Sequence, residues 1–283
     1  MKTVIVTYKT ILRNKRLTTI LSIILCILVF AGLSIAGFTI SEKGLRTDLE
    51  ERNLSPDACH IFGTDWLGRD MLTRIVKGLN LSLKIGLIAA GISTMIAVML
   101  GLCSALFGGM VDFVIIWMID LFMSLPHLVF LVLISFAAGG GAKGVVIGVA
   151  VTHWPALARV IRAEVLQLMN TEYIQIASKL GQSNTGIMTH HLLPHIVPQF
   201  LVGMILLFPH AILHEAGLSF IGMGLSPHTP AIGIILSESM RHLSTGYWWL
   251  AVIPGACLLF MVKLFDILGE NIRDWVNPKI LRG

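Results

Sequence analysis

The sequence predicts an all-α polytopic membrane protein with six transmembrane helices. Of its 283 residues, 55% are hydrophobic and only 13% are charged, whereas about 25% of the residues in a typical soluble domain are charged. The mean hydropathy of +0.82 agrees with this composition. A chain with so few charges cannot cover a water-facing surface, and several of its apolar stretches are long enough to cross a bilayer. We therefore expect residues 1–283 to form one transmembrane domain in the lipid bilayer.

Six apolar stretches have the length of about 20 residues that a transmembrane helix needs. They are residues 17–40, 81–108, 112–138, 144–162, 199–224 and 247–268. The first stretch is longer than the roughly 7–15 apolar residues of a cleaved secretory signal, so we interpret it as a permanent span. Prolines interrupt four of the stretches, at Pro126, Pro155, Pro209 and Pro254. Because neighbouring helices can satisfy the carbonyls that a proline frees, we expect kinks at these positions and not helix ends.

Basic residues near the ends of the spans predict their orientation, because Lys and Arg gather in cytoplasmic loops. Residues 1–16 contain five basic residues and no acidic residue, so the N-terminal segment is expected in the cytoplasm. Six spans return the tail, 269–283, to the same side. Within the five-span core, 81–268, the loop 163–198 is expected in the cytoplasm, whereas segment 41–80 is expected outside it. The net charge of +5 follows this pattern and does not indicate a nucleic-acid partner.

Small residues recur at every fourth position of the second stretch. They are Ala89, Ser93, Ala97, Gly101, Ala105 and Gly109, and Gly140, Gly144 and Gly148 repeat the pattern near the fourth stretch. In lipid, helices associate where small side chains let their backbones approach closely. The two stripes therefore predict packing seams, either within this chain or against another subunit.

The stretch between the fourth and fifth expected spans is too long for a simple turn. Residues 172–181 read EYIQIASKLG, and residues 182–194 read QSNTGIMTHHLLP. A glycine supplies the left-handed conformation that commonly follows a helix, so a short helix is expected to end near Gly181. A second short helix is expected to start near Ser183 and to run towards Pro194. Together the two helices would form a compact projection that docks in a groove of a partner.

The spacing of Glu172, Ala177, Gly181, Leu193 and Pro194 resembles the EAA loop of ABC importer permeases. In that family the loop is the coupling helix that sits in a cleft of the ATPase subunit, so the resemblance implies an ATPase-coupling role for these five residues.

Three further stretches resemble the C-type permeases of the dipeptide, oligopeptide and nickel importers. Residues 62–70, FGTDWLGRD, resemble the GTDxLGRD signature, although a capped turn with an Asp65–Arg69 ion pair would explain them equally well. Residues 218–224, LSFIGMG, resemble LSFLGLG, and residues 268–278, LGENIRDWVNP, resemble LGDxLRDxLDP. The sequence departs from the family patterns at Ile174, Glu270, Asn271 and Asn277.

The resemblance implies a type I ABC importer permease fold in the cytoplasmic membrane of a prokaryote. It implies a non-catalytic subunit that forms a path for nickel or metal chelates, which the sequence slightly favours, or for short peptides. The implied partners are a homologous permease subunit, two ATP-binding subunits and an extracytoplasmic solute-binding protein. No cofactor is expected.

Four ionisable residues lie near the middle of the fourth and fifth expected spans, where a charge costs roughly 2.5–3.5 kcal/mol. They are His153, His210, His214 and Glu215. They either line the path of a polar solute or form a buried network that fixes helix packing. His210 and His214 are spaced to chelate a metal ion, but a tight site would trap an ion that must pass, so no metal site is assigned. His127, in the third stretch, has no assigned role.

The sequence contains no GxxxxGK(S/T) nucleotide-binding motif, so the energy for transport must come from another subunit or from an ion gradient. The alternative function is a secondary transporter. Such proteins usually contain two related halves, and no convincing internal repeat is present. An intramembrane enzyme would need further convergent acid, base or metal-binding groups.

Overall fold

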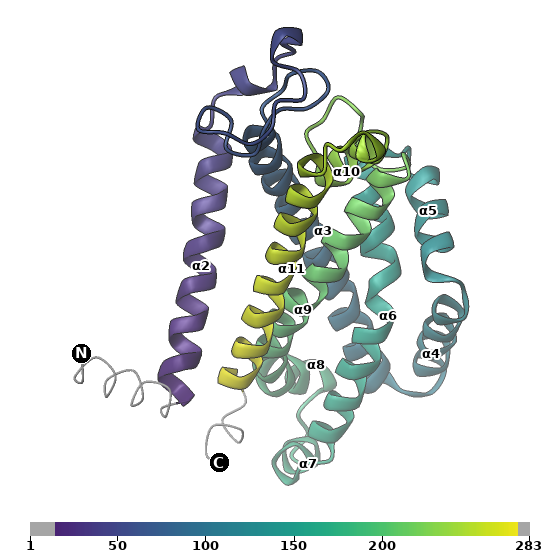
Figure 1. The fold of residues 1–283 in the computed structure, drawn as a ribbon. Helices are drawn as coiled ribbons and strands as arrows, with labels where there is room; N and C mark the ends of the chain where they lie inside the picture. The colour runs from purple at the N-terminus through teal and green to yellow at the C-terminus, as the bar shows by residue number, and fades with distance from the viewer. Residues whose placement is uncertain (1–14, 277–283) are drawn as a thin grey trace, which may run out of the picture. The chain divides into compact units, whose positions relative to one another are not determined.

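The computed structural model of the chain describes residues 15–276 (Figure 1), and the regular elements in that range are all helices. Most of the expected N-terminal segment 1–16 and the end of the tail 269–283 lie outside the described residues. Tertiary contacts divide the chain into two compact units. The first unit comprises the residues up to 86 and those from 212 onward, and the second unit comprises Leu87–Ala211.

Within residues 15–276, five helices are long and apolar enough to cross a membrane. They are α2 (Lys15–Thr39), α3 (Met71–Phe107), α6 (Gly141–Met169), α9 (Leu193–Phe220) and α11 (Trp249–Val276). A sixth crossing is available if α4 (Gly109–Ser124) and α5 (His127–Ala137), which are bent by 102° relative to each other, form one span. Each expected span overlaps one of these helices or this pair. The predicted helical, polytopic class is confirmed, and the sidedness of the termini stays a prediction.

The expectation that Pro126 only kinks a continuous helix over 112–138 is wrong. The chain leaves the helical conformation after Ser124, and Pro126 is the N-cap of α5. Leu125 has φ −86° and ψ 145°, the extended conformation that a residue before proline favours because the proline ring clashes with a helical predecessor. The remaining prolines of the spans do lie inside helices, as expected: Pro155, Pro209 and Pro254.

Several helix ends differ from the apolar stretches because polar residues extend the helices. α3 begins at Met71 and not at residue 81, since the Asp70 carboxylate accepts hydrogen bonds from the Thr73 backbone N–H at 2.8 Å and from Thr73 Oγ1 at 2.7 Å. Such a cap satisfies an N–H that the first helical turn leaves without an intrahelical partner. α10 (Ile232–Met240) lies where the sequence predicted no element.

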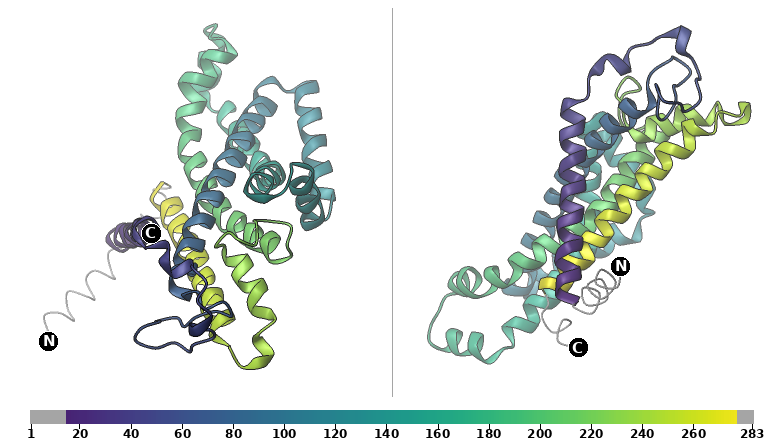
Figure 2. Two further views of the ribbon diagram at one scale, coloured as in Figure 1. Left: turned by 90° about the horizontal axis from the view of Figure 1, so that it is seen from above. Right: turned by 60° about the vertical axis from the view of Figure 1, so that its left-hand side comes forward.

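In the first unit, α2 lies beside α11 (Figures 1 and 2). The rings of Phe30 and Phe265 are 4.0 Å apart between centroids. Asn80 of α3 donates a hydrogen bond to the Ser34 carbonyl of α2 at 3.0 Å. These contacts attach the first span to α11 and α3.

A buried ion cluster organises the segment before α3. Asp65 is 2% exposed and accepts hydrogen bonds from the backbone N–H groups of Leu67 at 2.8 Å and Arg69 at 2.9 Å. The Arg69 side chain pairs with Asp65 at 2.7 Å, as the sequence predicted, and Arg74 pairs with it at 2.5 Å. Both arginines also contact Glu238 of α10, at 3.0 and 2.7 Å. Two positive and two negative charges thereby join residues 62–70 to α10, which supports the structural interpretation of that motif.

In the second unit, each stripe of small residues includes positions at helix contacts within the chain, although Gly109 and Gly140, at the ends of the stripes, have no neighbour within 4 Å of an added Cβ atom. A Cβ atom added to Gly101 of α3 would lie 2.8 Å from the Ala158 carbonyl of α6. A Cβ atom on Gly144 of α6 would lie 2.5 Å from the Ser135 carbonyl of α5. Only glycine permits these backbone approaches. The contacts support the packing of this chain's own helices as the role of the stripes.

Candidate functional site

The loop between α6 and α9 contains two short helices, of which α7 lies beyond the end of α6 (Figures 1 and 2). α7 comprises Glu172–Lys179, and α8 comprises Asn184–Ile187. Glu172 lies in the first turn of α7 and Lys179 in the last, where each charge complements the helix dipole. The expected first helix of the loop is therefore present.

The end of α7 is a Schellman cap centred on Gly181. Gly181 has φ +85°, and its N–H donates to the Ser178 carbonyl at 3.0 Å. The N–H of Gln182 donates to the Ala177 carbonyl at 3.1 Å. These are the two hydrogen bonds that define the motif, and they require a left-handed residue at the glycine position. Ala177 and Gly181, two of the five residues of the EAA resemblance, thus belong to one cap.

The second half of the loop differs from the expectation at Pro194. A π-helical turn covers Met188–Leu192, in which the Leu193 N–H bonds to the Met188 carbonyl. α9 then begins at Leu193 and runs through Pro194, so the chain does not leave the helix there. The helix continues from α8 through this turn into α9, since residues 185–220 form one unbroken helical stretch. Pro194 therefore lies inside a helix, directly after a π turn of the kind that accommodates an interrupted hydrogen-bond ladder.

Three loop residues anchor this segment in the core of the second unit. Ile174 of α7 is 2% exposed, and Ile187 and Leu192 are also buried. They pack in one hydrophobic cluster with residues of α3, α6 and α9, such as Leu102 and Ile161. The loop is consequently a packed part of the fold. A displacement of α7 would be transmitted to those helices, because packed cores deform little.

The opposite face of α7 is apolar and exposed. Tyr173, Ile176 and Leu180 are 49%, 57% and 82% exposed. Their spacing of three and then four residues places them on one side of the helix. The sequence analysis did not single them out, although this spacing beside Ile174 indicates a helix with two apolar faces. Exposed apolar patches are typical of surfaces that contact another protein or a membrane.

His191, in the π-helical turn, contacts residues at both ends of the α7 segment. Its Nε2 lies 3.1 Å from Gln182 Oε1, and its ring is 6.0 Å from the Tyr173 ring. These contacts join α7 to the π-helical turn, so the exposed face of α7 is held by its neighbours.

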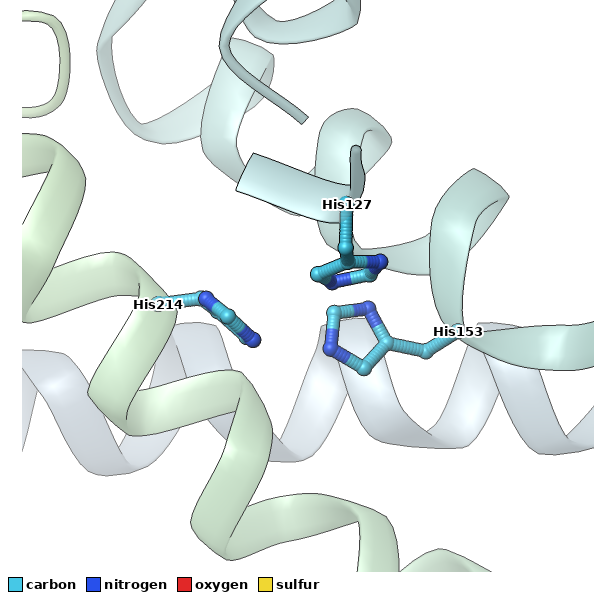
Figure 3. A group of neighbouring side chains, drawn as sticks. All are labelled: His127, His153 and His214. Carbon is cyan, nitrogen blue, oxygen red and sulfur yellow. The ribbon is translucent and has the colours of Figure 1, made fainter. Parts of the chain in front are cut away.

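Among the polar residues of the spans, His153 of α6 lies beside His127 of α5 (Figure 3). The two rings meet edge to face with centroids 4.6 Å apart. His153 Nδ1 is 3.0 Å from the Val149 carbonyl and 3.0 Å from Thr152 Oγ1. His127, to which the sequence analysis assigned no role, is therefore the neighbour of a predicted path residue.

Glu215 lies in a closed hydrogen-bond network of the first unit. It is 0% exposed and accepts hydrogen bonds from Ser82 Oγ at 2.5 Å and from Ser219 Oγ at 3.0 Å. Ser219 Oγ in turn accepts the Leu225 N–H at 3.1 Å. Ser219 belongs to the LSFIGMG stretch, so this motif helps to satisfy a buried carboxylate. The remaining two candidates, His210 and His214, lie one turn apart on α9.

Within the described residues, up to six membrane-length helices with polar side chains inside them define a multi-pass membrane protein. The family described as binding-protein-dependent transport system inner membrane component matches residues 93–282, and the chain belongs to this family. It is a multi-pass protein of the bacterial inner membrane and a permease of the ABC importer type.

The chain is similar to peptide permeases over most of its length. It is 33% identical to the dipeptide transport system permease protein DppC of Bacillus subtilis over 270 residues, which cover 95% of this chain and 84% of the relative. It is 32% identical to the oligopeptide transport system permease protein OppC of the same organism, over 83% of this chain and 76% of the relative. It is 30% identical to the probable D,D-dipeptide transport system permease protein DdpC of Escherichia coli, over 92% and 87%. Permeases of this family operate with ATPase subunits and a binding protein, and the C-type resemblance drawn from the sequence is confirmed.

Proposed function

We propose that this chain forms part of the translocation path for short peptides and that its loop 172–194 couples the path to separate ATPase subunits. The main support for the coupling role is that α7 has two opposite apolar faces. Ile174 is buried on one face, whereas Tyr173, Ile176 and Leu180 are exposed on the other. A groove on an ATPase subunit would cover that face and gain the free energy of burying its apolar area. The five residues of the EAA resemblance support the same role: Glu172, Ala177, Gly181, Leu193 and Pro194.

The mechanism that follows is alternating access. A solute-binding protein delivers the peptide to a mouth formed with a homologous partner permease, and closure of two ATPase subunits displaces α7. Because Ile174 packs in the same cluster as residues of α3, α6 and α9, this displacement moves the helices of the second unit together. The chain itself serves as the mechanical and path-forming subunit.

We assign the polar residues of the spans to the path as follows. His153 and His210 are the path residues of the second unit, and His214 is that of the first unit. Imidazole offers a donor and an acceptor without requiring a charge, which suits the peptide groups of a passing solute. Glu215 supports the path indirectly, since its two oxygens are engaged by Ser82 and Ser219.

Short peptides are favoured as the solute because the relatives described above are peptide permeases by name. A metal chelate is the second candidate, and the neighbouring rings of His127 and His153 favour it, since imidazole is a common ligand of transition metals. Proteoliposomes that contain the whole complex distinguish the two. Radiolabelled dialanine should accumulate in them, whereas accumulation of radioactive Ni²⁺ supplied with excess histidine would favour the chelate.

The coupling role is tested by Leu180→Ser, with Leu49→Ser as the matched control. Both leucines are exposed, at 82% and 61%, and Leu49 lies in segment 41–80 far along the chain from α7. Leu180→Ser should weaken binding of the ATPase subunits by about tenfold, the effect of losing an apolar anchor at an interface. The Leu49 variant should bind as the wild type does. Ion-driven uptake that persists without ATPase subunits would instead establish the secondary-transporter alternative.

A further inference from the structure

Helices α4 and α6 of the second unit are joined by two ion pairs of different character. Arg162 of α6 pairs with Asp112 of α4, and one turn earlier on α6 Arg159 pairs with Asp120. The side chains of the first pair are 27% and 21% exposed, whereas those of the second are 54% and 61% exposed. The two pairs link the same two helices, so they can be compared directly.

The Arg162–Asp112 pair has the geometry of a two-pronged fork. Arg162 Nε lies 2.6 Å from Asp112 Oδ1, and Nη2 lies 2.6 Å from Oδ2. Ser104 of α3 also donates its hydroxyl hydrogen to Asp112 Oδ1. Parallel hydrogen bonds of this kind fix orientation as well as distance, so the fork holds α4 at a defined angle to α6.

The chain connections of α4 provide little support of their own. α4 follows α3 through Gly108 and Gly109, whose φ angles are +57° and +49°, and a Cβ atom on either glycine would meet nothing within 4 Å. At its other end α4 leads into the bend at Leu125 and Pro126. Side-chain contacts with α6 and α3 must therefore determine how α4 is held at its first turn.

Those contacts lie on one face of each helix. Asp112, Ile115 and Ile119 are spaced by three and four residues along α4, and Trp154 and Ala158 precede Arg162 at four-residue intervals on α6. Ile115, Ile119, Trp154 and Ala158 form one buried cluster together with Ala97 of α3. The fork thus closes an apolar seam at the end of α6 that leads to α7. Arg162 precedes the end of α6 by seven residues, which is about 10 Å along a helix.

We propose that Arg162 and Asp112 are positioning residues for coupling: their fork makes α4 move with α6 when the ATPase subunits displace α7, and α4 in turn moves α5. His127 is the first residue of α5, and His153 lies on α6. If α4 and α6 move as one body, these two rings therefore stay together during transport. The proposal rests on the coupling role of α7 described above. It distinguishes the fork from the exposed pair, whose attraction is weakened by solvent.

The test compares matched substitutions in the complete complex reconstituted in proteoliposomes with its binding protein. Asp112→Asn and Arg162→Lys remove the fork, and Asp120→Asn and Arg159→Lys are the controls in the exposed pair. The measured quantity is the amount of dialanine accumulated per ATP hydrolysed. We expect both fork variants to lower this ratio by about fivefold or more, the lower end of typical coupling effects, while ATP hydrolysis continues. The controls should change it by less than about twofold.

A second measurement does not depend on the solute. Spin labels at Met123 of α4 and Ser178 of α7, in a chain whose four native cysteines are replaced by serine, report the distance between these helices by electron spin resonance. The wild type should keep the same distance with and without bound ATP, and Asp112→Asn should show a distance that changes with ATP.

The outcomes are separable. Three results would overturn the proposal. A fork variant could keep the wild-type ratio of dialanine to ATP, or a control could lower this ratio as much as its fork counterpart does. The α4–α7 distance could also respond to ATP identically in Asp112→Asn and in the wild type. If Asp112→Asn fails to assemble, Arg162→Lys, which retains the positive charge, decides by the same ratio. A wild-type complex that shows no ATP-dependent uptake at all defeats the proposed function instead.

Discussion

Glu215 is a fully buried carboxylate whose two oxygens each accept a hydrogen bond from a serine hydroxyl. A buried group that loses its partner costs about 1–3 kcal/mol. Glu215→Ala should therefore destabilise the subunit by about that amount, because the hydroxyls of Ser82 and Ser219 lose their acceptor. Glu215→Gln keeps an acceptor of similar shape and should cost less. The measurement is the melting temperature of each purified variant in detergent.

Uptake by these variants separates packing from a path role. If Glu215 only supports the fold, the Glu215→Gln complex should transport dialanine at the wild-type rate per folded molecule. A large loss of uptake in a Glu215→Gln variant of normal stability would place the carboxylate in the path.

At the scale of single residues, the sequence predicts which side chains are unusual but not which ones meet. An ionisable residue within an apolar stretch is visible at once, and His153 and Glu215 were both found in this way. Their neighbours were not, because Ser82 lies 133 positions from Glu215 and His127 reaches His153 only through the bend at Pro126. Contacts over such separations depend on helix packing, which periodicity alone does not specify.

At the scale of the element, Gly181 offers the sharpest test of α7. Its φ of +85° is accessible to asparagine at little cost but strongly disfavours a β-branched side chain. A Cβ atom at this position would meet nothing within 4 Å, so any effect must come from the backbone or from a partner. We expect Gly181→Val to lower dialanine uptake per ATP by about fivefold or more while the chain still inserts in the membrane.

Gly181→Asn is the control for this prediction. If the left-handed cap orients α7 towards the ATPase subunit, asparagine should restore most of the coupling. Equal losses in both variants would show that the side chain obstructs the interface and that the cap is not the determinant. Normal coupling in Gly181→Val would remove α7 from the coupling mechanism altogether.

A helix could be predicted from the sequence where a single local feature, such as apolar length or a terminal glycine, determines its extent. Apolar length was sufficient for the membrane-length helices, and the glycine after Leu180 predicted the end of α7. Pro126 and Pro155 show where the rule fails, since both are prolines in apolar stretches, yet one separates two helices and the other lies inside α6. Pro155 is buried against neighbouring helices, whereas Pro126 is exposed. The tertiary surroundings therefore decide whether the helix continues. α10 was missed because its nine residues are too short for a span-length search.

At the scale of the whole molecule, the remaining question is which side of the membrane each loop occupies. The positive-inside rule places the loop 172–194 in the cytoplasm and segment 41–80 on the outer side. The described part of the chain contains four free cysteines, of which Cys59 is exposed and Cys26 is buried, while Cys103 and Cys257 are intermediate and lie within helices. A maleimide that cannot cross membranes should therefore label Cys59 in intact spheroplasts.

Two chains serve as controls. A Cys59→Ser chain should remain unlabelled. The same chain with Thr185→Cys, an exposed position of the loop, should be labelled only after the membrane is permeabilised. The orientation matters for the mechanism because ATP, and hence any ATPase subunit that grips α7, is cytoplasmic. Labelling of Thr185→Cys from outside, with Cys59 protected until permeabilisation, would put α7 beyond the reach of ATP. The exposed face of Tyr173, Ile176 and Leu180 would then require a different partner, and both coupling proposals would fail together even though the helical architecture stayed the same.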